Sequence, residues 1–522
     1  MNKIKFITNQ LSIKKSSILL LAAFMTSGLM QSQEMFVNAE AELFISPGDA
    51  LYINNNLTVN NNGNLTVRSD ENSSGSLLVS GTATGDIIYE RYIPNDIWHI
   101  ISSPVTTQEI NSFANADNSI VTKEGGSKFA LGNYTNSNTS GLKWEYYTDS
   151  SLPSAGNFIS GKGYAAKREN AGYFTFKGNM TTTDVDFVMS SSDNDFWSCI
   201  GNPYPSFTLA SLSGSSESLL KNNIQSMDQS YIALYFWDES EYRALNLISD
   251  GDYIAPGQGV FVNAASNNET FTFSQSLQNH QSEGTAFYRS TEHPTIKLFL
   301  NDDDGQTSTT LKYIDDCSLG LDPGYDAGAF KLGNHTPQLS IYTQLVEENQ
   351  NIDNILQCLP NFELESYPIP VSVSARAGTN IEFSASLTDF PEDTYVYLED
   401  TENKQITDLK QENYQLNVKE DLAGIGRFYL FTSSEERNVT EELVKPINIY
   451  TTERELIISG LSEHEDATLK LYNVLGQEVY SKQLKGTQTT SISLANLPSA
   501  IYITKVNTNK RLISKKIIVE NE

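Results

Sequence analysis

The hydrophobic positions along the chain follow the period of two that is typical of β-strands. Short runs such as LTV at residues 57–59 and YVYLED at residues 395–400 alternate or run apolar at strand length, and Asn, Gly, Asp and Pro separate them. Successive side chains of a strand point to opposite faces, so alternation places one face of each strand in a core. The pattern therefore predicts an all-β protein with several separate modules.

The N-terminus is the exception to this pattern. Positive charges that include Lys14 and Lys15 precede an apolar stretch at residues 18–30, and small polar residues follow at 31–33. This order is typical of a secretory signal peptide. The apolar stretch is shorter than the roughly 20 residues that a membrane-spanning helix needs. We therefore expect residues 1–33 to be a signal peptide that is removed near residue 33.

Residues 36–92 contain very short alternating strands separated by Asn and Gly. Both residues tolerate the left-handed backbone of tight turns. A strand of three or four residues cannot bury a face alone, so these strands are expected to stack as rungs or to cap the next domain.

A diverged tandem duplication follows, and it contains every tryptophan of the chain. Copy 1 spans residues 93–185 and copy 2 spans residues 192–285. NDIWHIISSP at 95–104 matches NDFWSCIGNP at 194–203, so that Trp98 corresponds to Trp197. Later matches in the same order pair Trp144 with Trp237, the GxG at 161–163 with the GxG at 257–259, and YFTF at 173–176 with TFTF at 270–273. Each copy is expected to be a β-sandwich or half of a shared one.

The tryptophans have two interpretations. Strand periodicity with Ile100 and Ile200 favours packing in a core, while rings that stay exposed would form a platform on which sugars stack. Cys199 falls where copy 1 has Ile100, which favours a buried apolar position over a nucleophile.

Two further β-units are expected in the C-terminal half. Residues 286–443 alternate like a β-sandwich module, and residues 444–522 like a small sandwich of about seven strands. The final unit contains KLYNVLGQEVY at 470–480, ISLANLPSAIYITKV at 492–506 and KKIIVE at 515–520.

These three motifs resemble the type A C-terminal sorting domain of cargo proteins of the Bacteroidetes type IX secretion system. Ala500 stands where that family usually has Gly. The resemblance implies transport by the type IX secretion machinery and a place outside the cell, secreted or at the outer-membrane surface. It also implies removal of the sorting domain and attachment to surface lipopolysaccharide. GLDPGYDAGAF at 320–330 resembles a β-module found ahead of such domains in flavobacterial surface proteins.

Charge and cysteine content narrow the function classes. The 522 residues contain 35 Lys and Arg against 64 Asp and Glu, a net charge of −29. This excess of negative charge opposes binding to nucleic acid. The chain has 3 cysteines, which form no metal motif and no disulfide framework, and pairing of Cys317 with Cys358 is left open.

Signatures of catalysis are missing from the sequence. The 5 histidines form no HExxH motif and no GxSxG elbow occurs, so we expect no cofactor. Carboxylates such as Glu145 and Asp252 are abundant, but only their spacing in the fold would show an acid/base pair. Asp302 and Asp304 flank a turn and are a weak candidate site for Ca²⁺, with a charged turn as the alternative.

We therefore expect a non-catalytic secreted or cell-surface protein that presents β-modules for adhesion or for binding an extracellular polysaccharide. The alternatives are a secreted polysaccharide hydrolase or lyase and a structural component of a surface layer. The candidate glycan-binding residues are aromatic side chains that would stack on sugar rings if exposed: Trp144, Trp237, Tyr146, Tyr147 and Tyr242.

Overall fold

The computed structural model confirms the all-β class, with 55% strand and 6% helix. The structure describes residues 34–39, 41–60, 65–123, 127–136, 143–189, 196–212, 215–237, 241–249, 252–281, 293–330, 338–349, 351–361, 367–434, 436, 447–452, 455–461, 465–485, 489–509 and 512–519. The expected signal peptide lies outside these residues. Within the described ranges, no helix is long and apolar enough to cross a membrane.

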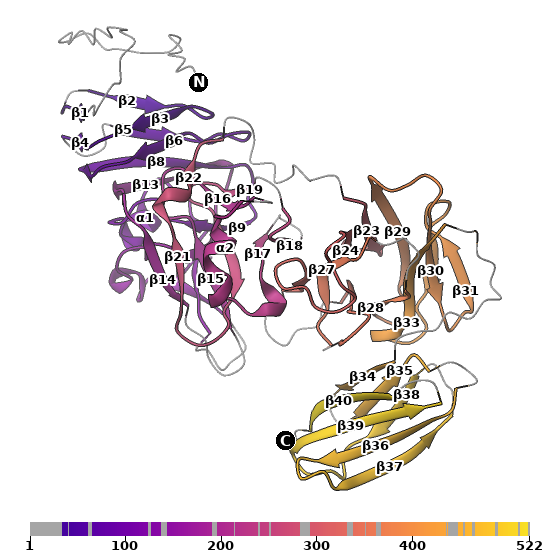
Figure 1. The fold of residues 1–522 in the computed structure, drawn as a ribbon. Coiled ribbons are helices and arrows are strands. Elements are labelled where there is room, and N and C mark those ends of the chain that lie inside the picture. Colours follow the sequence, from indigo (N-terminus) through magenta and orange to yellow (C-terminus); the bar gives the residue numbers. More distant parts are fainter. Residues whose placement is uncertain are drawn as a thin grey trace.

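The N-terminal strands stack in parallel into a short coil, visible at one end of the molecule in Figure 1. Three rows form, with the orders β1-β4-β7, β2-β5-β8 and β3-β6. Val37, Ile45 and Ile53 point into the coil and are buried, because each faces an equally apolar residue of the next turn. The strands are β1 (Met35–Val37), β2 (Leu43–Ile45), β3 (Ala50–Ile53), β4 (Leu57–Val59), β5 (Leu65–Arg68), β6 (Ser76–Val79), β7 (Ala83–Thr84) and β8 (Asp86–Ile93).

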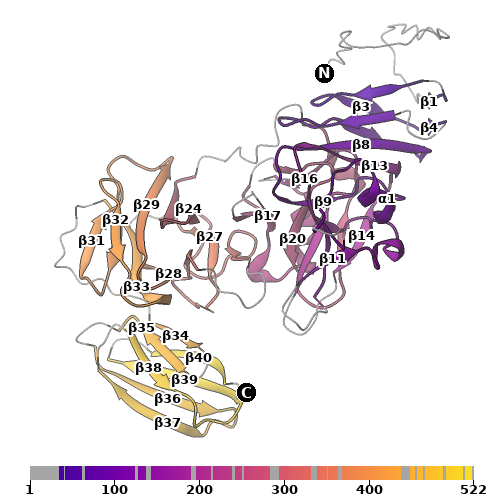
Figure 2. The same cartoon turned by 180° about the vertical axis from the view of Figure 1, so that it is seen from behind.

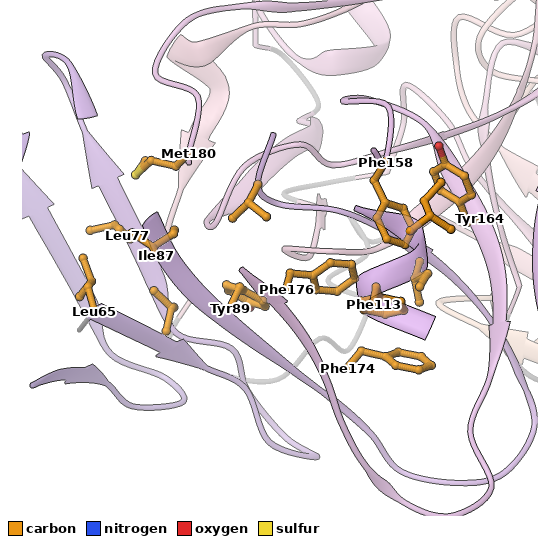
Figure 3. Packing of buried hydrophobic residues seen from close by; sticks show 14 of the residues in the cluster. Leu65, Leu77, Ile87, Tyr89, Phe113, Phe158, Tyr164, Phe174, Phe176 and Met180 are labelled. Atoms are coloured by element: carbon orange, nitrogen blue, oxygen red, sulfur yellow. The ribbon is translucent and has the colours of Figure 1, made fainter. Parts of the chain in front are cut away.

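Copy 1 forms an antiparallel sheet of order β11-β10-β12-β9 beside the coil. Its elements are β9 (Trp98–Ser102), α1 (Ile110–Asn115), β10 (Lys128–Tyr134), β11 (Trp144–Thr148), η1 (Leu152–Ser154), β12 (Gly163–Lys167) and β13 (Gly172–Asn179). Strand β8 pairs with β5 of the coil on one side and with β13 on the other. The coil and copy 1 consequently share one core, in which Tyr89 of β8 lies between Leu65 and Phe176 (Figure 3).

Copy 2 repeats this arrangement with the sheet order β15-β20-β17-β18. Its elements are β14 (Val185–Met189), β15 (Trp197–Gly201), β16 (Phe207–Ser211), α2 (Leu219–Asn223), η2 (Ile224–Ser226), η3 (Gln229–Tyr231), β17 (Leu234–Trp237), β18 (Tyr242–Leu245), β19 (Asp252–Ile254), β20 (Gly259–Asn263), β21 (Glu269–Phe273), η4 (Gln275–Leu277) and β22 (Gln278–Asn279). Strand β14 pairs with β21 as β8 pairs with β13. The structural repeat thus begins one strand before the boundary expected for each copy. In copy 1 the sequence hides this strand, because β8 also continues the parallel coil and has the same pattern as the strands of the coil.

The two copies meet through a pseudo-two-fold contact. The amide of Ser102 donates to the carbonyl of Gly257, and the amide of Gly201 donates to the carbonyl of Gly161, both at 2.9 Å. These pairs exchange under the sequence match of the copies, which is the signature of an isologous interface. The copies therefore form one unit with a shared interface.

Glycines allow this close approach. A Cβ at Gly163 would lie 2.5 Å from the Cys199 Sγ, and a Cβ at Gly259 would lie 2.5 Å from the Ile100 Cγ2. Ile100 and Cys199 are the matched positions of the two copies, so the same contact occurs twice. The GxG motifs are needed because any side chain at their second glycine would overlap the other copy.

The β-sandwich module forms an extended sheet of order β31-β30-β33-β28-β26-β27-β24-β23-β29-β32, with β25 paired to β27. Its apolar residues form a core of their own. Its strands are β23 (Thr295–Asn301), β24 (Gln306–Tyr313), β25 (Ala327–Gly328), β26 (Ser340–Thr343), β27 (Asn354–Leu359), β28 (Ile369–Ala375), β29 (Asn380–Thr388), β30 (Tyr395–Asp400), β31 (Gln405–Asp408), β32 (Tyr414–Asn417) and β33 (Leu422–Ser433).

The C-terminal unit is a two-sheet sandwich with a separate core, shown in yellow in Figures 1 and 2. The sheets have the orders β34-β35-β38 and β37-β36-β39-β40. Lys515 joins this unit to the module before it, because its Nζ donates to the Asn349 carbonyl at 2.7 Å and to the Asn351 Oδ1 at 3.0 Å. The strands are β34 (Asn448–Thr452), β35 (Glu455–Ser459), β36 (Ala467–Asn473), β37 (Glu478–Leu484), β38 (Thr489–Ser493), β39 (Ala500–Thr508) and β40 (Leu512–Val519).

Candidate functional site

Three of the aromatic candidates lie on β11, an edge strand of the copy 1 sheet. Because side chains alternate along a strand, Trp144 and Tyr146 share one face and Tyr147 lies on the other. The Trp144 ring meets Tyr134 of β10 edge-on, at a centroid distance of 5.3 Å. Tyr147 instead packs against the core shared by the coil and copy 1. The structure therefore separates Tyr147 from the other candidates.

The remaining two candidates face each other in the β17–β18 hairpin of copy 2. Trp237 and Tyr242 are cross-strand partners, with ring centroids 5.0 Å apart. The Tyr242 ring also packs on Phe330 of the β-sandwich module, at 4.3 Å. Tyr242 thus touches a residue from a different module, whereas Trp237 contacts its hairpin partner.

Strand order corrects one match between the copies. The sheet orders put β10 in the place of β17 and β11 in the place of β18. The cross-strand pairs are Tyr134 with Trp144 in copy 1 and Trp237 with Tyr242 in copy 2. Tyr134 is therefore equivalent to Trp237, and the sequence match of Trp144 with Trp237 is wrong. Two facing positions of a cross-strand pair fill the same space, so the indole can come from either strand.

Phe261 of β20 connects the candidates of the two copies. Its ring lies 5.9 Å from Trp144 and 5.7 Å from Tyr242, both in edge-to-face geometry. We call Trp144, Trp237, Tyr242 and Phe261 the aromatic seam. Three of the five candidates are thus brought together, from strands that belong to different copies.

Tyr146 lies beside the aromatic seam and has its own partners. Its ring centroid is 5.2 Å from Trp98, and the Lys128 Nζ lies 4.9 Å from it on the ring face. Burial raises the pKa of Tyr146. Burial also raises the pKa of Tyr242, and the nearby Cys199 and Tyr146 raise it further. Both hydroxyls are therefore protonated at neutral pH and can donate hydrogen bonds.

The tryptophans differ in their exposure, which separates the core residue from those at the surface. Trp197 is only 8% exposed and packs against Tyr231, Tyr235 and Phe330, which confirms the core interpretation for this tryptophan. Trp144 and Trp237 are half-buried. Part of each of these two residues therefore remains at the protein surface.

A pocket of about 470 Å³ lies between copy 2 and the loop that precedes β25. Its polar side chains include Asp228, whose Oδ1 accepts from the Ser230 amide at 2.9 Å. The lining residues are Ile224, Gln225, Met227, Asp228, Gln229, Ser230, Ile232, Ala265, Leu321 and Pro323. The five aromatic candidates are not among them.

Asp302 and Asp304 lie in the turn between β23 and β24. The Asp302 Oδ1 accepts from the amides of Asp304 and Gly305, each at 2.9 Å. Among the residues that the structure describes, no group of three or more His, Cys, Asp or Glu side chains is placed to hold a metal ion. Calcium binding at this turn stays a prediction.

Two histidines have hydrogen-bond partners within the fold. The His99 Nε2 is 2.9 Å from the Asn95 Oδ1, and burial together with Arg91 lowers the pKa of His99 to about 4. The His280 ring lies between the Ser76 Oγ at 2.9 Å and the Gly48 carbonyl at 3.0 Å, and so ties copy 2 to the coil. These contacts give both rings a structural part.

Comparison with known families identifies two matches. Residues 8–431 match a family described as "Domain of unknown function (DUF8693)". Residues 451–520 match the "Secretion system C-terminal sorting domain", which agrees with the resemblance seen in the three C-terminal motifs. No curated protein matches the chain.

Proposed function

This chain belongs to the DUF8693 family and ends in the sorting domain of a type IX secretion cargo, and from this premise we propose that it binds an extracellular polysaccharide through its aromatic seam. The sorting domain indicates a protein that is secreted or attached to the cell surface. Such a protein meets polymers outside the cell.

The geometry of the aromatic seam supports this proposal. Edge-to-face contacts hold Trp144, and a tilted ring contact holds Trp237, so a sugar can stack on either ring without ordering a mobile side chain. Trp144 and Trp237 come from the two copies and both connect to Phe261, directly or through Tyr242. Two half-buried tryptophans offer two stacking positions for sugar units, and the Tyr146 hydroxyl adds a hydrogen-bond donor.

Charge favours one class of polysaccharide. The net charge of −29 opposes the approach of polyanions on average. We therefore expect a neutral glycan to bind more tightly than a sulfated or uronic-acid polymer. Attachment of the protein to surface lipopolysaccharide, which the resemblance implies, is a further part of the proposal.

Affinity electrophoresis tests the proposal directly. The full mature chain is run in gels that contain neutral or anionic polysaccharides, and released sugars are assayed in parallel. We expect retardation by a neutral polymer without product. Released oligosaccharides would indicate the hydrolase or lyase, and self-association without glycan would indicate a surface-layer component. Adding a calcium chelator to the same gels tests whether Asp302 and Asp304 contribute.

A further inference from the structure

We propose that Cys317 and Cys358 form a disulfide bond in the exported protein, and that this bond fastens the base of the loop that docks the β-sandwich module onto copy 2. Both cysteines are buried, with 7% and 0% of their surface exposed. Both are free thiols in the structure, and the neighbouring Cys317 side chain contributes to the raised pKa of Cys358.

The strand register brings the two cysteines together. Cys358 on β27 pairs with Lys312 on the parallel neighbour β24. The chain then turns back after β24, since the Cys317 amide donates to the Ile314 carbonyl at 3.1 Å. The Ile314 amide donates to the Leu359 carbonyl at 2.8 Å, which holds the turn beside β27. The sheet thus holds the backbone of Cys358, and the turn that is hydrogen-bonded to β27 holds Cys317 beside this strand.

The surroundings of the thiols tolerate the bond. The Cys358 Sγ donates to the Tyr325 carbonyl at 3.1 Å, and oxidation removes this donor. The Asn246 Nδ2 also donates to that carbonyl, at 2.5 Å, so the carbonyl keeps a partner. Burial raises the pKa of the Cys358 thiol. Because the thiolate is the reactive form, the buried pair reacts slowly once folded, so the bond forms while the module folds.

The redox chemistry balances through thiol–disulfide exchange. The two thiols lose two protons and two electrons as the Cys317–Cys358 sulfur bond forms. The electrons and protons pass to the disulfide of a dithiol oxidase, which becomes two thiols. Such oxidases act in the bacterial periplasm, and a cargo of the type IX system crosses this compartment.

The loop closed by this bond makes polar contacts to copy 2 on both sides of Tyr325. The Tyr235 hydroxyl donates to the Gly328 carbonyl at 2.7 Å, and the Leu247 amide donates to the Gly324 carbonyl at 2.9 Å. Phe330 packs on Tyr242 of the aromatic seam at 4.3 Å. The bond would therefore hold the loop that supports one side of the seam.

Cys199 provides an internal reference. It is 3% exposed and its Sγ lies against Gly163 at the interface of the copies. The proposal leaves this thiol unpaired. Denatured protein should therefore present one free thiol before reduction and three after it, because the chain has 3 cysteines.

Maleimide labelling with mass spectrometry of peptides tests the bond. The exported full-length mature protein is purified from the producing bacterium, denatured and labelled with and without reductant. We expect one label, on Cys199, before reduction and three afterwards. Three labels before reduction, or protection of Cys199, would overturn the proposal. Cys317→Ser and Cys358→Ser should each show two labels regardless of reductant, and Cys199→Ser should show none before reduction and two afterwards.

Thermal melting separates the bond from a general effect of reductant. Reduction should lower the melting temperature of the wild type by several degrees and leave the double variant Cys317→Ser/Cys358→Ser unchanged. An equal drop in both proteins would contradict a role for the bond in holding the loop.

Discussion

Ser102 and Gly201 occupy matched positions in the two copies and lie against each other. A Cβ at Gly201 would lie 2.3 Å from the Ser102 Cβ, and the two residues donate equivalent hydrogen bonds across the interface. Contact between matched residues marks the pseudo-two-fold axis. Only one of the two positions has room for a side chain, so one copy must have Gly where the other copy has Ser.

Exchange of these two residues gives a first prediction. Gly201→Ser should destabilise the protein by about 1–3 kcal/mol, because the new side chain overlaps Ser102. The double variant Ser102→Gly/Gly201→Ser moves the side chain to the other side of the axis and should regain most of this loss. Urea unfolding measures both. A double variant as unstable as Gly201→Ser would show that the axis is not symmetric enough to accept the exchange.

A pair of buried asparagines gives a second prediction. The Asn118 Oδ1 accepts from the Thr175 amide, and the Asn223 Oδ1 accepts from the Thr272 amide, both at 2.7 Å. Asn118→Leu and Asn223→Leu should each cost about 1–3 kcal/mol, since each leaves a buried amide without its acceptor. The exposed Asn54→Leu is the control and should change the free energy of unfolding little. Thr175 and Thr272 are matched positions of the two copies, so clearly unequal costs would contradict an equivalent role of the two asparagines.

The β-sandwich module gives a third prediction, at Asp400. This carboxylate is 1% exposed and accepts from the Arg427 Nη2 at 2.7 Å and from the Tyr414 hydroxyl at 2.6 Å. Asp400→Ala should destabilise the module by about 3 kcal/mol, because Arg427 and the Tyr414 hydroxyl lose a buried acceptor while Glu402 remains paired with the guanidinium. Chemical unfolding measures the change, and the exposed Asp303→Ala should leave stability unaltered.

Asp400 also makes stability depend on pH. Burial raises its pKa, but the hydrogen bonds from Arg427, Tyr414 and Asn403 outweigh burial and hold the pKa below its usual value. The stabilisation is therefore fully present above the ordinary pKa of 3.8 and is lost as the pH falls through the lower value of the folded state. Asp400→Asn should flatten the loss of stability below pH ~4. An unchanged acid profile would contradict this assignment.

The sequence predicted the fold class and the matched tryptophans Trp98 and Trp197, because period-two alternation and a repeated motif are local signals. It matched Trp144 with Trp237 wrongly, since the Tyr and the Trp of the cross-strand pair stand on opposite strands in the two copies. The contribution of Tyr134 was missed for the same reason. Its position opposite Trp144 depends on the hairpin register, which no local pattern specifies.

The sequence also did not predict the contacts between distant segments. Nothing around Phe261 or Phe330 distinguishes these rings from other core aromatics, yet they connect copy 1, copy 2 and the β-sandwich module. Tyr147 shows the converse. It was grouped with Trp144 and Tyr146 as a neighbour in sequence, but strand alternation turns it toward the opposite face.

The central claim is tested most directly by the dissociation constants of three proteins for the polysaccharide that retards the wild type in electrophoresis. The proteins are the wild type, Trp237→Ala, and Tyr52→Ala as a control that removes a ring 58% exposed on the N-terminal coil, away from the seam. Loss of one stacking ring should weaken binding about tenfold in Trp237→Ala and leave Tyr52→Ala equal to the wild type. Equal affinities of the wild type and a folded Trp237→Ala would contradict binding at the aromatic seam.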